Sequence, residues 1–332
     1  MDLRNLREIN QVSEQRLNQS PSQRKIVMIY GALTLGLMLL VTVVNYVLGL
    51  QIDNFGGLSN LGKRTMLSSV QTMLPIVQSL VLMCLDLGYV AAMLRIARGM
   101  YSSPQTLRLG FDRFWLMLRC GIFKGLIMTG AMLVCMYLGI MIFMATPFSK
   151  ATVEIVAPLV SQVSLLDTEL VIDDATYMLL VKSMVPAFAI CGVLMLVLGG
   201  PVYYNFRMVN YIIIDKPATG AMMALRESKK MMKGHRLQLL KLDISLWWYY
   251  LPTLVVMLLC YGDVLLPMLG VHLPVSETVA FFGFYVLYLA ASFGIHFFLR
   301  NRVEVCYALA YEAVKPEEKQ DKGVVLGNIF QM

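Results

Sequence analysis

The chain has 332 residues, of which 58% are hydrophobic and only 15% are charged. A soluble domain averages about 25% charged residues, so this composition argues against a water-soluble fold and predicts a chain that is solvated mostly by lipid. The formal net charge of +7 would fit nucleic-acid binding, but its distribution along the chain assigns it to a membrane surface.

The first 25 residues are polar and precede the first apolar run. Leu3, Leu6, Ile9 and Val12 recur at roughly helical spacing, which predicts a narrow amphipathic helix before the first membrane span. We expect residues 1–25 to form a cytoplasmic N-terminal segment.

Six apolar runs are each long enough to cross a bilayer, whose hydrocarbon core of about 30 Å takes about 20 helical residues. Helices are expected in all six, because lipid offers no hydrogen-bond partner to an open backbone group. The sequence therefore predicts an all-α, polytopic membrane protein whose membrane domain covers residues 26–314. The predicted spans lie near residues 26–50, 70–94, 121–145, 185–212, 242–266 and 278–299.

Lysine and arginine are concentrated in alternate connections between these runs. Five precede the first run, six lie between the second and third, eight lie between the fourth and fifth, and five follow the sixth, whereas the other connections hold only four; these counts include Lys124 and Arg207, which lie at the ends of adjoining runs. Because cytoplasmic loops carry the excess of these residues, we expect both termini, including the tail 315–332, on the cytoplasmic side. The positive charge then faces anionic lipid of the inner leaflet, and nucleic acid is not an expected partner.

Residues 218–237 predict a basic amphipathic helix at the cytoplasmic membrane surface. Ala221, Met222, Leu225 and Met232 form its apolar side. The opposite side and its flanks carry the expected contacts to lipid headgroups, which are Arg226, Lys229, Lys230, Lys233 and Arg236.

A similar arrangement follows the second span and the fourth span. Each has a polar turn with a proline, Pro104 or Pro217, then a basic stretch and a new span. Aligning the prolines places Arg113 opposite Arg226, and the N-terminal segment resembles a degenerate third copy. Either three helical-hairpin repeats or simple stacking of hairpins would produce this pattern.

The region around residues 211–252 resembles a bacterial integral membrane family called domain of unknown function 975. The matching pattern is an Asp-x-Pro turn, an Ala-Leu-x-x-Ser helix, a Met-Lys-Gly-x-Arg end and a Leu-x-x-Ser stretch, here Asp215, Pro217, Ala224, Leu225, Ser228, Met232, Lys233, Gly234, His235, Arg236, Leu242 and Ser245. The closing tyrosines and glutamate of the family resemble Tyr307, Tyr311 and Glu312.

This chain departs from the family pattern after Ser245, where Leu246, Trp247, Trp248 and Tyr249 replace a Phe-Ile-Gly-Trp sequence. The resemblance implies a multi-span protein of the bacterial cytoplasmic membrane with no assigned reaction. The family is also distantly similar to the membrane domain attached to some glycerophosphodiester phosphodiesterases, which suggests a link to lipids.

Asp86 lies inside the second predicted span, ahead of Arg95. At a rise of 1.5 Å per residue, its Cα lies roughly 13 Å from the cytoplasmic end of the helix. A carboxylate at the bilayer centre costs about 2.5–3.5 kcal/mol on insertion scales, so Asp86 should face the helix bundle or a wet cavity. It is either a proton or cation site or a hydrogen-bonded structural residue.

The fourth predicted span contains Gly199, Gly200 and Pro201, which predict a kink or an interruption. Broken helices line cavities in transporters, whereas a simple kink would leave Arg207 extended toward the inner interface. An ion pair between Asp86 and Arg207 is expected if the second and fourth spans touch. The candidate intramembrane polar site is therefore Asp86, Asn205, Arg207 and Asn210.

The sequence contains no phosphate-binding loop, zinc-ligand spacing or nucleophile elbow, and its three histidines are scattered. We therefore expect no enzyme activity, no cofactor and no metal site. The leading hypothesis is a non-enzymatic accessory or scaffold protein that contacts anionic lipid or an unidentified membrane partner. The alternative is a transporter for a small solute or ion, with a polar path near Asp86 and the broken fourth span.

Overall fold

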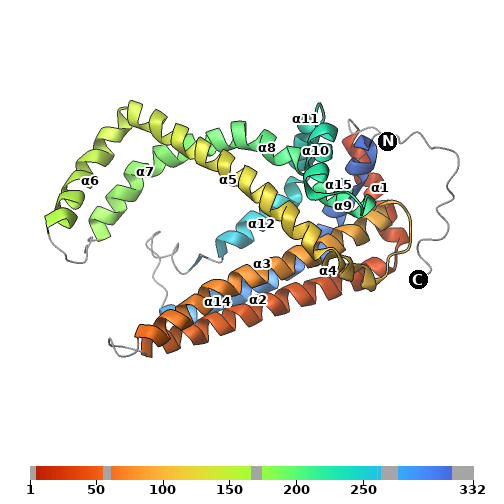
Figure 1. The fold of residues 1–332 in the computed structure, drawn as a ribbon, viewed down its shortest axis with the longest axis horizontal. Helices are drawn as coiled ribbons and strands as arrows, with labels where there is room; N and C mark the ends of the chain where they lie inside the picture. The colour runs from red at the N-terminus through yellow and green to blue at the C-terminus, as the bar shows by residue number, and fades with distance from the viewer. Residues whose placement is uncertain (1–4, 55–60, 166–173, 260, 263–275, 316–332) are drawn as a thin grey trace. The chain divides into compact units, whose positions relative to one another are not determined.

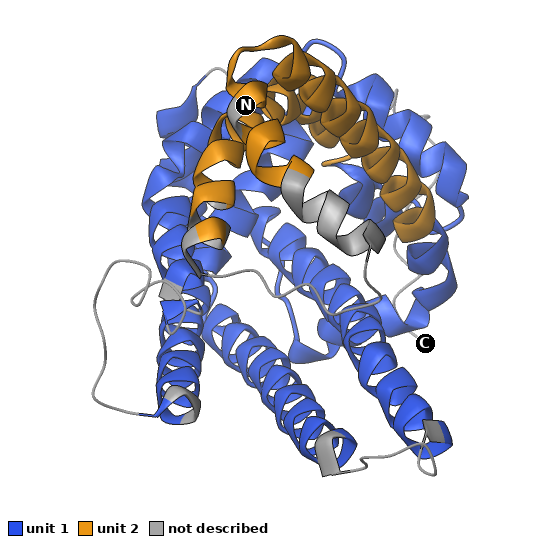
Figure 2. Cartoon of the chain, turned by 90° about the vertical axis from the view of Figure 1, so that its left-hand side faces the viewer, with its two compact units in different colours: residues 1–119, 208–332 blue, residues 120–207 orange. Residues whose placement is uncertain are grey.

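The computed structural model describes residues 5–54, 61–165, 174–259, 261–262 and 276–315. Within these ranges the regular structure is helical throughout, without a β-strand, as the all-α class requires. The chain divides into two units, which Figure 2 colours separately. Unit 1 comprises residues 1–119 and 208–332, and unit 2 comprises residues 120–207.

Unit 1 begins with a short amphipathic helix, α1 (Leu6–Gln19), whose first turn is capped by the Asn5 side chain. Its buried face includes Ile9 and Leu17, two turns apart, and packs against the C-terminal helix α15 (Asn301–Val314). A helix therefore forms where the sequence predicts one, and its cytoplasmic location stays a prediction.

Long apolar helices run side by side in unit 1 (Figure 1). Helix α2 (Ser22–Asn54) packs along α3 (Leu61–Ala97), and α14 (Glu277–Ile295) contacts α2. After α14 the chain continues through a π-helical segment, η4 (His296–Arg300), directly into α15. A π-helical turn contains more residues than an α-helical turn, so it changes which face of the helix the following residues occupy.

The core of unit 1 is formed by α15 and the C-terminal half of α3. Tyr89, Met93 and Leu94 on α3 have no exposed area, and neither do Val305 and Cys306 on α15. In contrast, the N-terminal half of α3 leaves its apolar side chains exposed. The C-terminal half of α3 is therefore packed inside unit 1, whereas its N-terminal half exposes an apolar surface.

Two glycines allow the connection after α3 to lie directly on that helix. A Cβ atom at Gly88 would lie 2.2 Å from the Leu107 carbonyl oxygen, and one at Gly110 would lie 1.8 Å from the Cys84 carbonyl oxygen. Only glycine permits backbones to approach this closely. The crossing segments are the 3₁₀-helix η2 (Pro104–Arg108) and the short helix α4 (Leu109–Asp112).

The predicted single helix over residues 218–237 is wrong, because the structure has two helices there. The first ends at Met231 and the next begins at Arg236. Gly234 lies between them with a φ of +93°, a left-handed conformation that breaks the helix and that glycine adopts without strain. The helices of this region are α9 (Val209–Asp215), α10 (Ala221–Met231), α11 (Arg236–Ser245) and α12 (Trp247–Leu259).

Unit 2 contains most of α5 (Phe114–Ala145), followed by α6 (Phe148–Leu165) and α7 (Asp174–Leu194). The predicted interruption near Pro201 is present as the π-helical segment η3 (Met195–Gly199) and the short helix α8 (Gly200–Asn205). Pro201 cannot donate a backbone hydrogen bond to the preceding turn, which accounts for the change of helix type before it.

Five helical stretches of the described residues are long and apolar enough to cross a membrane. The sixth predicted span, near residues 242–266, corresponds to α11 and α12, and α12 itself has 13 residues. Its last residues fall partly outside the described ranges. The five stretches are Ser22–Ile52, Gly62–Ala97, Phe114–Ala145, Lys182–Asp215 and Val279–Val314.

Candidate functional site

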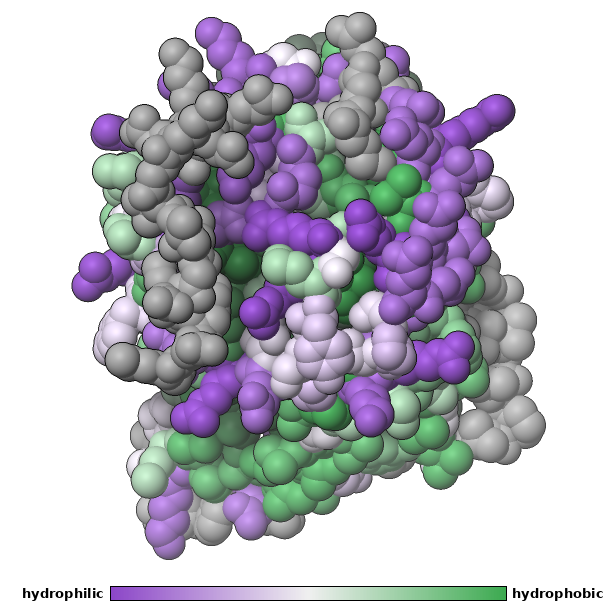
Figure 3. Space-filling view, turned by 90° about the vertical axis from the view of Figure 1, so that its right-hand side faces the viewer, coloured by the Kyte–Doolittle hydropathy of each residue, from purple (hydrophilic) through white to green (hydrophobic). Residues whose placement is uncertain are grey.

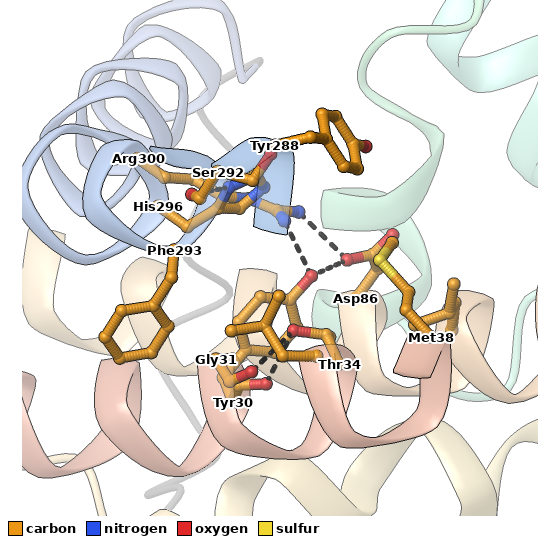
Figure 4. A pocket seen from close by; sticks show the side chains of 12 residues that line it. Tyr30, Gly31, Thr34, Met38, Asp86, Tyr288, Ser292, Phe293, His296 and Arg300 are labelled. Carbon is orange, nitrogen blue, oxygen red and sulfur yellow. Dashed lines mark hydrogen bonds and ion pairs between the residues drawn. The ribbon is translucent and has the colours of Figure 1, made fainter. Parts of the chain in front are cut away.

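Asp86 lies in a cluster of polar side chains that joins three separate helical segments. The Arg300 Nη2 atom donates to Asp86 Oδ1 at 2.9 Å, and Arg300 Nη1 donates to the Tyr30 hydroxyl at 2.6 Å. The Tyr30 hydroxyl in turn donates to the same carboxylate oxygen. Figure 4 shows these three side chains pointing toward one another from α2, α3 and η4. Arg300 is thus an ion partner of Asp86, and the expected pair of Asp86 with Arg207, which lies in unit 2, stays a prediction.

Two tyrosine rings and the π-helical segment hold Arg300 in place. Its guanidinium carbon lies 4.8 Å from the centre of the Tyr30 ring and 5.2 Å from that of Tyr89, and the two rings stack on each other. Cations are attracted to aromatic faces at these distances. Arg300 Nε also lies 4.0 Å from Glu304 Oε1, one turn later. The cluster therefore contains two carboxylates and one guanidinium.

A cavity of about 140 Å³ adjoins the cluster, which is room for several water molecules or a small organic group. One end is polar, with Asp86, His296 and Arg300, and the other is apolar, with Leu35 and Leu82. Asp86 is 43% exposed, and within the described part of the chain its Oδ2 atom has no hydrogen-bond donor. That oxygen can accept a hydrogen bond or a proton from a molecule in the cavity. The remaining lining residues are Tyr30, Gly31, Thr34, Met38, Tyr288, Ser292 and Phe293.

His296 belongs to the same cavity and is oriented by its own helix. Its Nδ1 atom lies 2.7 Å from the Ser292 carbonyl oxygen, which can only accept, so Nδ1 carries the proton. Among the described residues no group of three or more histidine, cysteine, aspartate or glutamate side chains could hold a metal ion.

A second polar cluster is centred on Asp215, at the end of α9. Arg98 Nη2 lies 2.8 Å from both carboxylate oxygens, Lys315 Nζ lies 2.8 Å from Oδ2, and the Tyr311 hydroxyl donates to Oδ2 at 3.0 Å. Arg98 also donates from Nε to Glu312 at 2.8 Å. Two cations and two carboxylates balance in this cluster, and Asp215 is only 8% exposed. We call these five residues the Asp215 cluster.

The charge state of Arg98 is set by its surroundings. Burial disfavours its positive charge, but hydrogen bonds and attraction from Asp215 and Glu312 outweigh that effect and raise the pKa of the guanidinium. Arg98 is therefore permanently charged and acts as a fixed link between the end of α3 and the two carboxylates.

The C-terminal helix carries residues of every cluster along its length. Arg300 and Glu304 belong to the first cluster, whereas Tyr311 belongs to the Asp215 cluster. Between them the Tyr307 hydroxyl donates to Asp243 and also contacts the Tyr250 hydroxyl. The closing tyrosines and glutamate of the sequence pattern thus tie α15 to the rest of unit 1, whereas Arg300 does the same for η4.

The other members of the predicted polar site do not all lie in one unit. Asn210 lies half-buried on α9 in unit 1, while Asn205 and Arg207 lie in unit 2. Asn205 is buried at the end of α8, and Arg207 Nη1 donates to the Tyr203 hydroxyl at 2.9 Å. Their grouping with Asp86 stays a prediction.

The predicted lipid-contacting cations lie on and beside α10. Ala224 and Ser228 are fully buried on one face of this helix. Met222 and Met223, which are 48% and 64% exposed, lie on the other face, so Met222 does not share the buried face of Ala221 and Leu225 with which the sequence pattern grouped it. Figure 3 shows hydrophilic side chains gathered on the upper part of one face of the molecule. Of the predicted contacts, Arg226, Lys229, Lys230 and Lys233 are exposed, and Arg236 is half-buried.

Sequence reasoning did not identify Arg300 or Tyr30 as site residues, and it named Asp215, Tyr311 and Glu312 only as parts of a family pattern, not as one cluster. Arg300 entered only the count of lysine and arginine residues that follow the last predicted span. Its spacing of four residues from both His296 and Glu304 is nevertheless the spacing that places side chains on one helix face. The partners of Asp215 lie far from it in the chain, so no local pattern could identify them.

Comparisons with known proteins give one clear result. The sequence profile of the family described as "Protein of unknown function (DUF975)" matches residues 8–318. Neither the curated proteins nor the solved structures include a match. Since the matched region covers nearly the entire chain, the chain belongs to the DUF975 family.

Proposed function

We propose that the chain is a six-span protein of the bacterial cytoplasmic membrane and that its basic cytoplasmic surface binds anionic lipid. In this proposal it acts as a non-enzymatic accessory or scaffold for a membrane partner. The observation that carries it is the exposed face of α10, where Arg226, Lys229 and Lys230 lie beside two exposed methionines. The opposite face of the helix is buried in the protein.

Two further features support this arrangement. The long apolar stretches expose large side chains, among them Leu126 at 66% and Leu196 at 78%. Such exposure is unfavourable in water and favourable in lipid. The concentration of lysine and arginine in alternate connections favours a cytoplasmic location for both termini. Each cation near an anionic surface then contributes about 1 kcal/mol of attraction. The sixth span of this proposal is the apolar run near residues 242–266, whose described part contains α12.

The lipid preference can be measured with the full chain reconstituted in vesicles. Spin-labelled phosphatidylglycerol and phosphatidylcholine report the relative affinity of the protein for an anionic and a zwitterionic lipid. We expect a preference for phosphatidylglycerol that falls when Arg226, Lys229 and Lys230 are replaced by Gln, and that also falls at high salt. A matched control replaces Lys63, Arg64 and Lys150, which are exposed on the predicted outer side.

The control variant should retain the preference. If the wild-type protein binds both lipids equally, or if all variants behave alike, lipid recognition by this surface is excluded. The orientation is tested separately by adding a protease-sensitive tag to either end, which should be cleaved only from the cytoplasmic side.

A second candidate function, transport of a small solute or ion, is favoured by the cavity next to Asp86. The Asp86 side chain, which is 43% exposed and lines the cavity, gives such a solute a place to bind. In a cysteine-free background, the Asp86→Cys variant should react with a small water-soluble thiol reagent, whereas the Leu87→Cys variant should not, because Leu87 is fully buried. Absence of labelling at position 86 would remove this candidate.

A further inference from the structure

A basic groove lies where α10, the turn after it and the end of α15 meet. Its volume is about 500 Å³, which is large enough for a lipid headgroup. The turn exists because Gly234 adopts a positive φ, and it places Lys233 and His235 beside the last turns of α10. The lining residues are Met223, Arg226, Glu227, Lys230, Met231, Lys233, His235 and Val314.

The groove has an excess of positive charge without a matching acid. Arg226, Lys230 and Lys233 have no ion-pair partner within the described part of the chain. The single carboxylate of the lining, Glu227, accepts a bond from Lys216 Nζ at 2.6 Å and is therefore already neutralised. Three unpaired cations around one hollow fit a phosphate, whose oxygens accept several charge-assisted hydrogen bonds.

The apolar part of the lining distinguishes a lipid from a free anion. Met223 is 64% exposed at the groove, and Met222 continues this apolar surface along the same helix. A free phosphate would gain nothing from these side chains, but the glycerol and acyl region of a phospholipid would cover them. Exposed methionines next to cations are expected where a helix lies at a membrane interface.

We propose that this groove is a specific binding site for the phosphate headgroup of an anionic phospholipid, held by Arg226, Lys230 and Lys233. The proposal rests on the proposed function and refines it, because it replaces a diffuse basic surface with one defined site. The lipid affinity of a diffuse surface depends on how many charges are removed. The lipid affinity of a defined site depends on which charges are removed.

Two double variants separate these possibilities. Lys230→Gln with Lys233→Gln removes two cations that line the groove. Lys25→Gln with Lys241→Gln removes two exposed cations that do not line it and that are not among the expected headgroup contacts. Both variants change the net charge equally, and both remove charge from the predicted cytoplasmic side. The variant Lys230→Arg with Lys233→Arg keeps the charge and serves as the rescue.

Binding of phosphatidylglycerol is measured with the purified full chain in phosphatidylcholine nanodiscs. We expect the groove variant to lose at least about tenfold in affinity, the rescue variant to bind nearly as the wild type does, and the control variant to lose less than about threefold. Thermal unfolding of each variant checks that the fold is retained.

Three outcomes would overturn the proposal. Equal losses in the two Gln variants would leave a diffuse lipid-binding surface and exclude the groove as a site. Equal binding of phosphatidylglycerol and phosphatidylcholine by the wild-type chain would refute the proposed function itself. Displacement of the lipid by inorganic phosphate at millimolar concentration, with no dependence on Met223→Ser, would assign the groove to a free phosphate.

Discussion

Arg300 and Asp86 are separated by 214 residues in the sequence and lie 2.9 Å apart in the fold. The pair joins the C-terminal half of α3 to the π-helical segment that precedes α15, and Tyr30 of α2 bonds to both. Three segments that are distant in the chain are therefore held together by one carboxylate, one guanidinium and one hydroxyl.

Breaking this pair should destabilise the fold in a way that depends on which partner is removed. A fully buried pair loses about 3–5 kcal/mol when one partner is deleted. Arg300 is 17% exposed and Asp86 is 43% exposed, so the effect of either deletion should fall below that range. We expect Arg300→Met to lower the thermal unfolding temperature in detergent more than Asp86→Asn, because Asn still accepts a bond from Tyr30.

The double variant Asp86→Asn with Arg300→Met provides the check. Its loss of stability should be smaller than the sum of the two single losses, since the two residues interact directly. Additive losses would mean that the contact contributes nothing measurable.

The Asp215 cluster predicts unequal effects for its two acids. Asp215 is 8% exposed and accepts bonds from Arg98, Lys315 and Tyr311, whereas Glu312 is 34% exposed and bonds to Arg98. Asp215→Ala should therefore lower the free energy of unfolding by more than Glu312→Ala does, because it leaves two cations and a hydroxyl with fewer partners. Equal unfolding temperatures for the two variants in detergent would contradict this ranking.

The close contact of Gly88 with the backbone at Leu107 gives a further prediction, for which Gly125 provides a matched control. Gly88→Ala should destabilise the chain by about 1–3 kcal/mol, because its new methyl group would overlap the backbone at Leu107 and force the segments apart. Gly125→Ala adds the same methyl group on a helix where nothing lies within 4 Å. That control should be neutral or slightly stabilising, since alanine favours helix more than glycine does.

Gly234 should tolerate asparagine better than alanine. Its φ of +93° costs an ordinary L-residue about 1–2 kcal/mol, and asparagine adopts such conformations more readily than alanine. We expect Gly234→Ala to lower the unfolding temperature and to weaken phosphatidylglycerol binding by disturbing the basic groove. Gly234→Asn should change both less. If alanine and asparagine behave alike, backbone conformation at this turn is unimportant.

The helical class and the positions of the long helices could be predicted, because they depend on the summed hydropathy of consecutive residues. A run such as residues 121–145 is apolar enough to form a long helix regardless of its neighbours, and α5 covers it. The break before Pro201 was likewise predictable, because proline removes a backbone donor wherever it stands. The family could also be predicted, because its pattern from Asp215 to Ser245 is a continuous stretch of the sequence.

The partners of the polar residues could not be predicted in the same way. Asp86 was identified as an unusual carboxylate, but its pairing with Arg300 depends on how α3 packs on η4 and on a π-helical turn that hydropathy does not indicate. The same applies to Gly88 and Gly110, which resemble any other glycine until two backbones are brought together.

The sequence by itself determined the helical class, the apolar stretches and the location of the positive charge, because each follows from properties of neighbouring residues. The tertiary structure alone decided which charges meet, which face of α10 is exposed and where Lys230 and Lys233 enclose a groove. These depend on the rotation and register of helices that are far apart in the chain, and both are fixed only when side chains pack.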